Sequence, residues 1–290
     1  LCTAGVDDLR ADGLDGLYAG GKRTGPTGLP LAEGGWRSYR SGSSTVLPEV
    51  ERFRQEGSGN LRASARTGEP LLEARDRAMS DFPNLTVLKH PLIEHKLSFL
   101  RDVETGKKLF KELVDEIAML LAYEVTSDLG TEEVRVETPL ESTTGDIVLG
   151  ERLTLVPILR AGLGMVDGVI DLIPTMRVGH IGLQRDHDTL EPIDYYFKIP
   201  PPLEESVLIV VDPMLATGGS ASAAVSYLKK SGGSRIRMMC IVAAPEGVQR
   251  MLDDHPGVPV YAAALDRELN ERGYILPGLG DAGDRLFGTD

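Results

Sequence analysis

The stretch that decides the fold is Val207–Ser220, which reads VLIVVDPMLATGGS. Its first five residues are apolar and mostly β-branched, which predicts a strand buried on both faces of a sheet. Asp212-Pro213 ends this strand, because proline has no amide hydrogen to donate to a neighbouring strand. Thr217-Gly218-Gly219-Ser220 follows, and the Ala-rich segment Ala221–Lys230 is predicted to be a helix with lysines in its last turn.

A strand, a glycine-rich turn and a helix in succession predict a phosphate-binding loop. Glycines let backbone amides approach an anion, and the helix dipole favours its negative charge. Asp212 would place a carboxylate at the carboxyl end of the strand, where open α/β sheets bind their ligands. The alternative is a purely structural turn, because such units occur throughout α/β proteins.

The composition is that of a globular protein: the 290 residues are 41% hydrophobic and 26% charged. No apolar run approaches the roughly 20 residues that a membrane helix needs, and the pattern of a secretory signal is missing. The two cysteines, Cys2 and Cys240, are too few for a disulfide framework. Cys240 lies in an apolar run and is predicted to be a core residue. These features predict a cytoplasmic protein that does not bind membranes.

The formal net charge of −13 argues against nucleic-acid binding, which requires a basic face. An acidic protein that holds a polyanionic ligand must supply positive charge locally. Arginines, backbone amides and Mg²⁺ are the expected sources.

Residues 1–78 differ from the rest of the chain in being rich in glycine and lacking sustained periodicity. Such a segment buries too little apolar surface to offset the entropy of ordering. We interpret it as a disordered N-terminal extension, or as sequence upstream of a start at Met79 that is not part of the native protein.

From residue 85 onward, strand patterns alternate with helical ones, which predicts an α/β fold with a mostly parallel sheet flanked by helices. The longest amphipathic helix is expected at Glu104–Thr126, and Val134–Leu140 alternates as an outer strand or hairpin would. The other expected elements are a short strand or extended entry at 86–88, strands at 153–159, 176–183, 236–244 and 258–265, a helix that follows the loop 160–164 and runs to about residue 172, and a helix at 246–252.

Two arginines are candidates for binding the anion. Arg160 follows the expected strand 153–159, and Arg185 lies in a polar stretch that is long enough to form a hood over the site. The alternative for Arg185 is an exposed arginine among acidic neighbours. Gly162–Asp167 approximates a dinucleotide-binding fingerprint, but its third position is Asp167, with Gly168 one place late.

The C-terminal segment combines glycines with apolar residues. Gly273–Arg285 reads GYILPGLGDAGDR, so it can pack against the core while its backbone approaches a planar ligand closely. The alternative is a frayed terminus.

Four motifs, taken in order, resemble the uracil phosphoribosyltransferases, a branch of the type I phosphoribosyltransferases. They are PILRAGLG at 157–164, the Arg185 region with TLEP at 189–192, DPMLATGGS at 212–220, and GYILPGLGDAGDRLFGT at 273–289. General members of the superfamily carry two adjacent acids where this chain has Asp212-Pro213, and a single acid is typical of the uracil branch. The resemblance covers about 85–290 and implies a domain at 79–290 with a hood or β-arm and a C-terminal base-binding segment.

The resemblance implies the reaction of uracil with 5-phospho-α-D-ribose 1-diphosphate (PRPP) to give UMP and diphosphate. It implies catalytic roles for Arg160, Arg185, Asp212 and Asp281. The residues implied to bind PRPP are Arg160, Arg185, Asp212, Pro213, Met214, Leu215, Ala216, Thr217, Gly218, Gly219, Ser220 and Asp281. Those implied to bind uracil are Ile275, Gly280, Asp281 and Ala282.

Mg²⁺ is the implied cofactor, carried by PRPP and not by a dedicated protein site. The resemblance also implies GTP as a candidate effector and a homo-oligomer, a dimer or higher. A non-catalytic nucleotide-binding regulator on the same fold is the main alternative function, and an NAD-binding Rossmann enzyme is the second.

Overall fold

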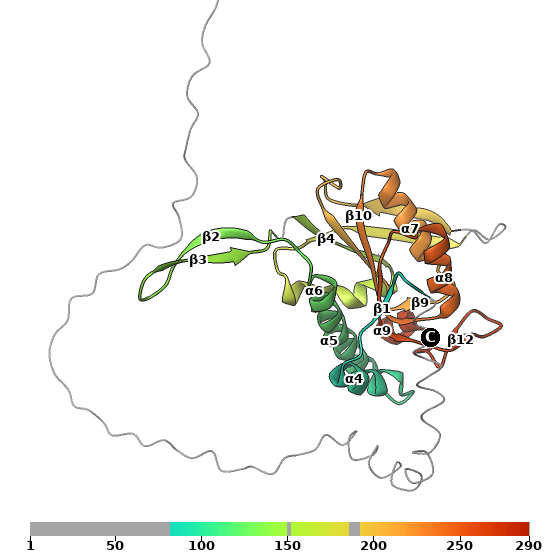
Figure 1. Ribbon diagram of the computed structural model, residues 1–290. Helices are drawn as coiled ribbons and strands as arrows, with labels where there is room; N and C mark the ends of the chain where they lie inside the picture. The colour runs from blue at the N-terminus through green and yellow to red at the C-terminus, as the bar shows by residue number, and fades with distance from the viewer. Residues whose placement is uncertain (1–81, 150–151, 186–191, 290) are drawn as a thin grey trace, which may run out of the picture. The chain divides into compact units, whose positions relative to one another are not determined.

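The computed structural model describes residues 82–149, 152–185 and 192–289 (Figure 1). The predicted extension at 1–78 and most of the predicted hood segment, residues 186–191, lie outside the described residues. Among the helices that the structure describes, none is both long enough and apolar enough to cross a membrane.

The predicted parallel sheet is confirmed, with β8 (Val207–Val211) in its interior. In sheet order the strands are β1 (Leu85–Val87), β11 (Val260–Leu265), β10 (Arg235–Ala243), β8, β4 (Leu153–Leu159), β6 (His180–Arg185) and β7 (Pro192–Lys198). Two short strands join it, β5 (Arg177–Val178) beside β4 and β9 (Met214–Leu215) beside β10. The ladders are parallel except between β6 and β7.

Helices cover both faces of this sheet, as predicted. Val207, Ile209 and Val211 of β8 pack in one core cluster with α4 (Pro91–Arg101), α5 (Lys107–Val125) and α6 (Val166–Leu172). Leu208 and Val210 point the other way, into a second cluster with α7 (Gly219–Lys230) and α8 (Pro245–Asp254). The buried Cys240 belongs to this second cluster, which confirms its prediction as a core residue.

Two sequence predictions are wrong in detail. The helix expected at 104–126 begins at Lys107, and a separate helix, α4, precedes it. His90 caps α4 through its Nδ1, which accepts a hydrogen bond from the Leu92 amide at 3.1 Å. The strand expected at 176–183 divides into β5 and β6 around Gly179, where a Cβ would lie 2.6 Å from Ile199.

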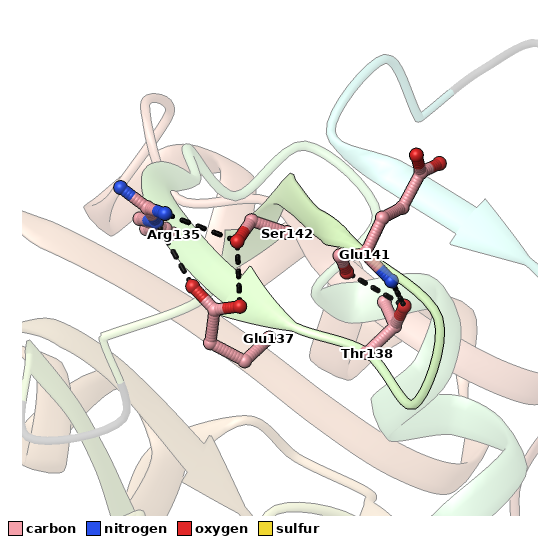
Figure 2. Close-up of polar contacts among 5 residues, drawn as sticks. All are labelled: Arg135, Glu137, Thr138, Glu141 and Ser142. Atoms are coloured by element: carbon pink, nitrogen blue, oxygen red, sulfur yellow. Dashed lines mark hydrogen bonds and ion pairs between the residues drawn. The ribbon is translucent and has the colours of Figure 1, made fainter.

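The alternating segment near residue 134 forms a hairpin, one of the two forms predicted. It consists of β2 (Glu132–Glu137) and β3 (Ser142–Ile147), which pair with each other in a sheet of their own and extend away from the large sheet (Figure 1). Thr138 closes the turn by donating to the carbonyl of Glu141 at 2.7 Å and accepting from its amide at 3.0 Å (Figure 2).

Candidate active site

The loop between β8 and α7 has the geometry of an anion cradle. Gly218 adopts a left-handed conformation, with φ of 74°, and no side chain caps the N-terminus of α7. The first helical hydrogen bond runs from the Ser222 amide to the Gly218 carbonyl at 2.9 Å. Because the earliest amides of a helix have no acceptor within the helix, they are directed at whatever lies before it.

Helix α8 supports this loop from behind by backbone contact. A Cβ added to Gly247 would lie 2.4 Å from the carbonyl oxygen of Ala216, and one on Gly218 would lie 2.8 Å from the carbonyl oxygen of Gly247. Glycine is therefore required on both sides of this contact. The loop is held by α8 and not only by the two elements that it connects.

Asp212 lies at the carboxyl end of β8 and is partly buried. Its Oδ1 accepts a long hydrogen bond from the Met214 amide at 3.4 Å. Burial raises the pKa of Asp212 to about 7, the Met214 bond opposes this shift, and the negative charge of Asp281 adds to it. The last effect places Asp281 near Asp212, although 69 residues separate them in sequence.

The segment after β4 packs against the end of β8. It forms a short 3₁₀ helix, η2 (Ala161–Met165), in which a Cβ on Gly162 would lie 2.5 Å from the carbonyl oxygen of Val211. The peptide bond between Leu159 and Arg160 is cis. The Arg160 side chain is 60% exposed, and its Nη2 lies 3.7 Å from Asp284 Oδ1. Its guanidinium is thus accessible and close to the C-terminal segment.

The glycines after β4 serve close packing. A Cβ on Gly168 would lie 2.1 Å from the carbonyl oxygen of Asp115, so Gly168 permits the close approach of α6 to α5. A Cβ on Gly164 would likewise lie 2.5 Å from the side chain of Leu286, so Gly164 permits the close approach of α9. Close packing of helices therefore explains why glycines occur at these positions, and no bound dinucleotide is needed to explain them.

The C-terminal segment is ordered and returns to this edge of the sheet. It contains β12 (Glu268–Leu269), β13 (Ile275–Leu276) and α9 (Ala282–Phe287), and Ile275 and Ala282 are buried. Gly280 has φ of 73°, and Asp281 caps α9 by accepting from the Asp284 amide at 3.0 Å. A Cβ on Gly283 would lie 3.9 Å from Ala161, so α9 contacts η2 directly.

The structure therefore brings Arg160, Asp212 and Asp281 to one place. Arg185 ends β6, and because β4, β6 and β8 are mutually parallel, Arg160, Arg185 and Asp212 all lie at the carboxyl edge of the sheet. The side chain of Arg185 is outside the described part. The remaining candidates lie in the β8–α7 loop and its helix start, from Pro213 to Ser220, and in the C-terminal segment at Ile275, Gly280 and Ala282.

Sequence reasoning missed the residues that hold the C-terminal segment. Arg101 and Asp266 both bind the backbone of Gly278, and Arg285 Nη1 donates to the carbonyls of Leu100 and Leu279 at 2.8 and 2.9 Å. Arg285 also lies over the Phe110 ring, 4.1 Å from its centroid. Asp266 directly follows a predicted strand, and this position at the ligand edge was the one available signal.

The described residues contain no cluster of three or more side chains of the kinds that ligate metals. They do bring Asp281 close enough to Asp212 for its negative charge to contribute to the raised pKa of Asp212.

Comparison with known proteins agrees with this geometry. The family model described as "Uracil phosphoribosyltransferase" matches residues 87–289. The chain belongs to the uracil phosphoribosyltransferase family. The match spans the β8–α7 loop, the η2 segment and the C-terminal segment together, and it confirms the family suggested by the four motifs.

Relatives in this family match at almost their full length. The uracil phosphoribosyltransferase of Listeria welshimeri is 59% identical over 206 residues, which cover 71% of this chain and 99% of the relative. That of Bacillus licheniformis is 60% identical over 203 residues, covering 70% and 97%. The solved structure of the AQ2163 protein from Aquifex aeolicus superposes with a TM-score of 0.68 at 35% identity, covering 71% of this chain and 99% of that one.

Proposed function

We propose that the segments that meet at the carboxyl edge of the sheet carry out the family's reaction, in which uracil and PRPP give UMP and diphosphate. The observation that supports this is the convergence of three separate segments. Gly162 of η2 contacts the end of β8, Gly283 of α9 lies beside Ala161, and Asp281 acts electrostatically on Asp212. A transferase must hold its donor and acceptor substrates next to each other, and the junction of these segments would provide that place.

The β8–α7 loop would bind the 5′-phosphate of PRPP. The amides of Ala216–Ser220 and the hydroxyls of Thr217 and Ser220 suit a phosphate, and the uncapped start of α7 adds its dipole. Pro213, Met214 and Leu215 would hold the loop against the sheet, since β9 pairs with β10. Backbone amides and the dipole of α7 would thus supply part of the positive charge that this acidic protein needs to bind a polyanion.

The diphosphate leaving group would be held by Arg160 and Arg185. A guanidinium binds phosphate oxygens through charge-assisted, bidentate hydrogen bonds. Arg160 is more than half exposed and only loosely paired with Asp284, so it can exchange that partner for the diphosphate. Stabilising the leaving group is the main electrostatic task of the reaction.

Asp212 would accept hydrogen bonds from the ribose hydroxyls and favour positive charge on the ring. Breaking the anomeric C–O bond builds that charge at the anomeric carbon. Since the bound donor brings its cationic partners close to Asp212, we expect its pKa to fall on binding and the carboxylate to form.

Uracil would be recognised by backbone groups of Ile275, Gly280, Asp281 and Ala282. The pyrimidine edge alternates carbonyl acceptors with N–H donors, which main-chain groups match. Cytosine would leave buried polar groups without partners and be rejected. Asp281 would in addition face the sugar side of the site, because it is the neighbour of Asp212.

Mg²⁺ would enter with PRPP, with Asp212 and Asp281 near its water shell. Mg²⁺ favours few protein carboxylates together with substrate phosphates, which fits a site with two neighbouring acids. When bound, the ion neutralises charge on the diphosphate. A GTP effector, a homo-oligomer and a cytoplasmic location stay predictions.

The test is UMP formation from labelled uracil and PRPP, with cytosine, orotate and hypoxanthine as controls. We expect turnover with uracil alone, dependent on Mg²⁺. An Arg185→Ala variant should raise KM for PRPP about tenfold or more without changing the choice of base. Nucleotide binding without turnover would instead identify a regulator on this fold.

A further inference from the structure

We propose that Arg101 and Asp266 are positioning residues that determine the enzyme's preference for uracil. They do so by fixing the backbone of Gly278 at the centre of the base-selecting segment. This inference rests on the proposed function of that segment.

Arg101 and Asp266 together form hydrogen bonds with both backbone polar groups of Gly278, its amide and its carbonyl. Asp266 Oδ2 accepts from the Gly278 amide at 2.9 Å, and Arg101 Nη1 donates to the Gly278 carbonyl at 2.9 Å. The two side chains also bind each other bidentately, with Nη2 to Oδ1 at 2.6 Å and Nη1 to Oδ2 at 2.8 Å. Gly278 is thus held from both sides by a single planar unit.

The anchors of this unit are rigid. Asp266 directly follows β11, its side chain is 4% exposed, and its amide donates to the Ala243 carbonyl at 2.8 Å. Arg101 is the last residue of α4, which packs on the core through Leu97 and Leu100. The position of Gly278 is therefore fixed by hydrogen bonds to residues on the sheet edge and on α4.

Fixing Gly278 also fixes the neighbouring residues that we propose bind uracil. Its φ is 65°, and a Cβ there would lie 2.1 Å from the carbonyl oxygen of Ile275, so the turn 275–278 is closed tightly. Gly280 follows two residues later. Main-chain recognition of a base depends on donors and acceptors held at fixed places, and a displacement of about 1 Å costs about a hundredfold in rate.

The experiment compares Arg101→Lys with the charge-neutral double variant R101Q/D266N. Lysine keeps the charge but lacks the second nitrogen that a bidentate contact needs. The double variant leaves no unpaired buried charge, so it avoids the main cause of misfolding if lysine proves disruptive. Lys96→Gln is the matched control, because Lys96 is also on α4 and bonds across to Glu116 of α5 at 2.5 Å.

We expect both variants to raise KM for uracil at least about tenfold and to lower the uracil-to-cytosine ratio of kcat/KM similarly. KM for PRPP and the PRPP-induced rise in Tm should stay close to wild type, and Lys96→Gln should behave as wild type throughout. A merely structural pair would lower Tm without this split between substrates.

Folded variants with an unchanged uracil KM and unchanged base ratio would overturn the inference while leaving the proposed function intact. Equal losses for uracil and PRPP would overturn it as well. A wild-type protein that forms no UMP would instead refute the proposed function, and the inference with it.

Discussion

At the scale of single residues, Asp212 stands out because its surroundings favour its protonated form. Burial and the nearby charge of Asp281 raise its pKa to about 7, from the 3.8 of an ordinary aspartate. Between about pH 4 and pH 7, Asp212 is therefore protonated in the folded protein but already deprotonated in the unfolded chain. Stability from this group is present near pH 4, declines as the pH rises, and is lost above about pH 7.

Asp212→Asn should consequently stabilise the folded protein at pH 8, by up to about 4 kcal/mol, and have little effect near pH 4. The same substitution should lower kcat at least about tenfold, because an amide cannot stabilise the charge that forms on the ribose. Urea unfolding at both pH values, together with kcat at pH 8, measures these effects. An equal change in stability at both pH values, or an unchanged kcat, would contradict the assignment.

At the scale of elements, the phosphate loop depends on a helix that is not adjacent to it in the chain. Helix α8 begins at Pro245, 26 residues after Gly219, the last glycine of the loop, and the backbone of its Gly247 contacts the loop directly. Gly247 lies against the carbonyl oxygens of Leu215 and Ala216, with Cβ distances of 2.7 and 2.4 Å. A side chain there must displace the loop.

Gly247→Ala should therefore raise KM for PRPP about tenfold and destabilise the fold by about 1–3 kcal/mol, with little change in KM for uracil. Gly257→Ala is the control, since no heavy atom lies within 4 Å of a Cβ at that position. Steady-state kinetics and thermal melting of the two variants make the comparison. Similar behaviour of the two would mean that the backbone contact is unimportant.

At the scale of the whole molecule, the first described helix and the last segment of the chain close the site together. Arg101 bonds to Gly278 across 177 residues of sequence, and Arg285 bonds to Leu100 across 185. Every residue assigned to the site lies between 160 and 282, and Phe82 is the first buried core residue in the described part of the chain. We therefore propose that residues 79–290 contain everything that activity requires.

A chain that begins at Met79 should match the full chain in kcat, in both KM values and in Tm. The physical reason is that every residue assigned to the site, and the helix α4 that binds the C-terminal segment, lies after residue 79. Kinetics, thermal melting and gel filtration of the two chains side by side provide the check. Precipitation of the shorter chain, or a loss of activity, would assign a role to residues 1–78.

The individual strands, loops and motifs of this chain could be predicted from its sequence. A five-residue β-branched run, a proline and paired glycines sufficed for the strand at 207–211 and its loop, and the strand at 153–159 matches its prediction at both ends. Alternation predicted an outer strand or a hairpin near 134, of which the hairpin is found, and four motifs together predicted the family, which is confirmed. These signals are local, because they depend on side-chain periodicity and on the limits of proline and glycine.

The contacts between these elements became known only from the three-dimensional structure. The nearness of Asp212 to Asp281, the contact of Gly162 with Val211 and the hold of Arg101 and Asp266 on Gly278 leave no periodic trace in the sequence. The existence of α4 was missed although Ile93, Leu97 and Leu100 recur at helical spacing, and the start of α5 at Lys107 was placed three residues early. Contacts between distant residues arise from the packing of buried faces, which a reading along the chain does not contain.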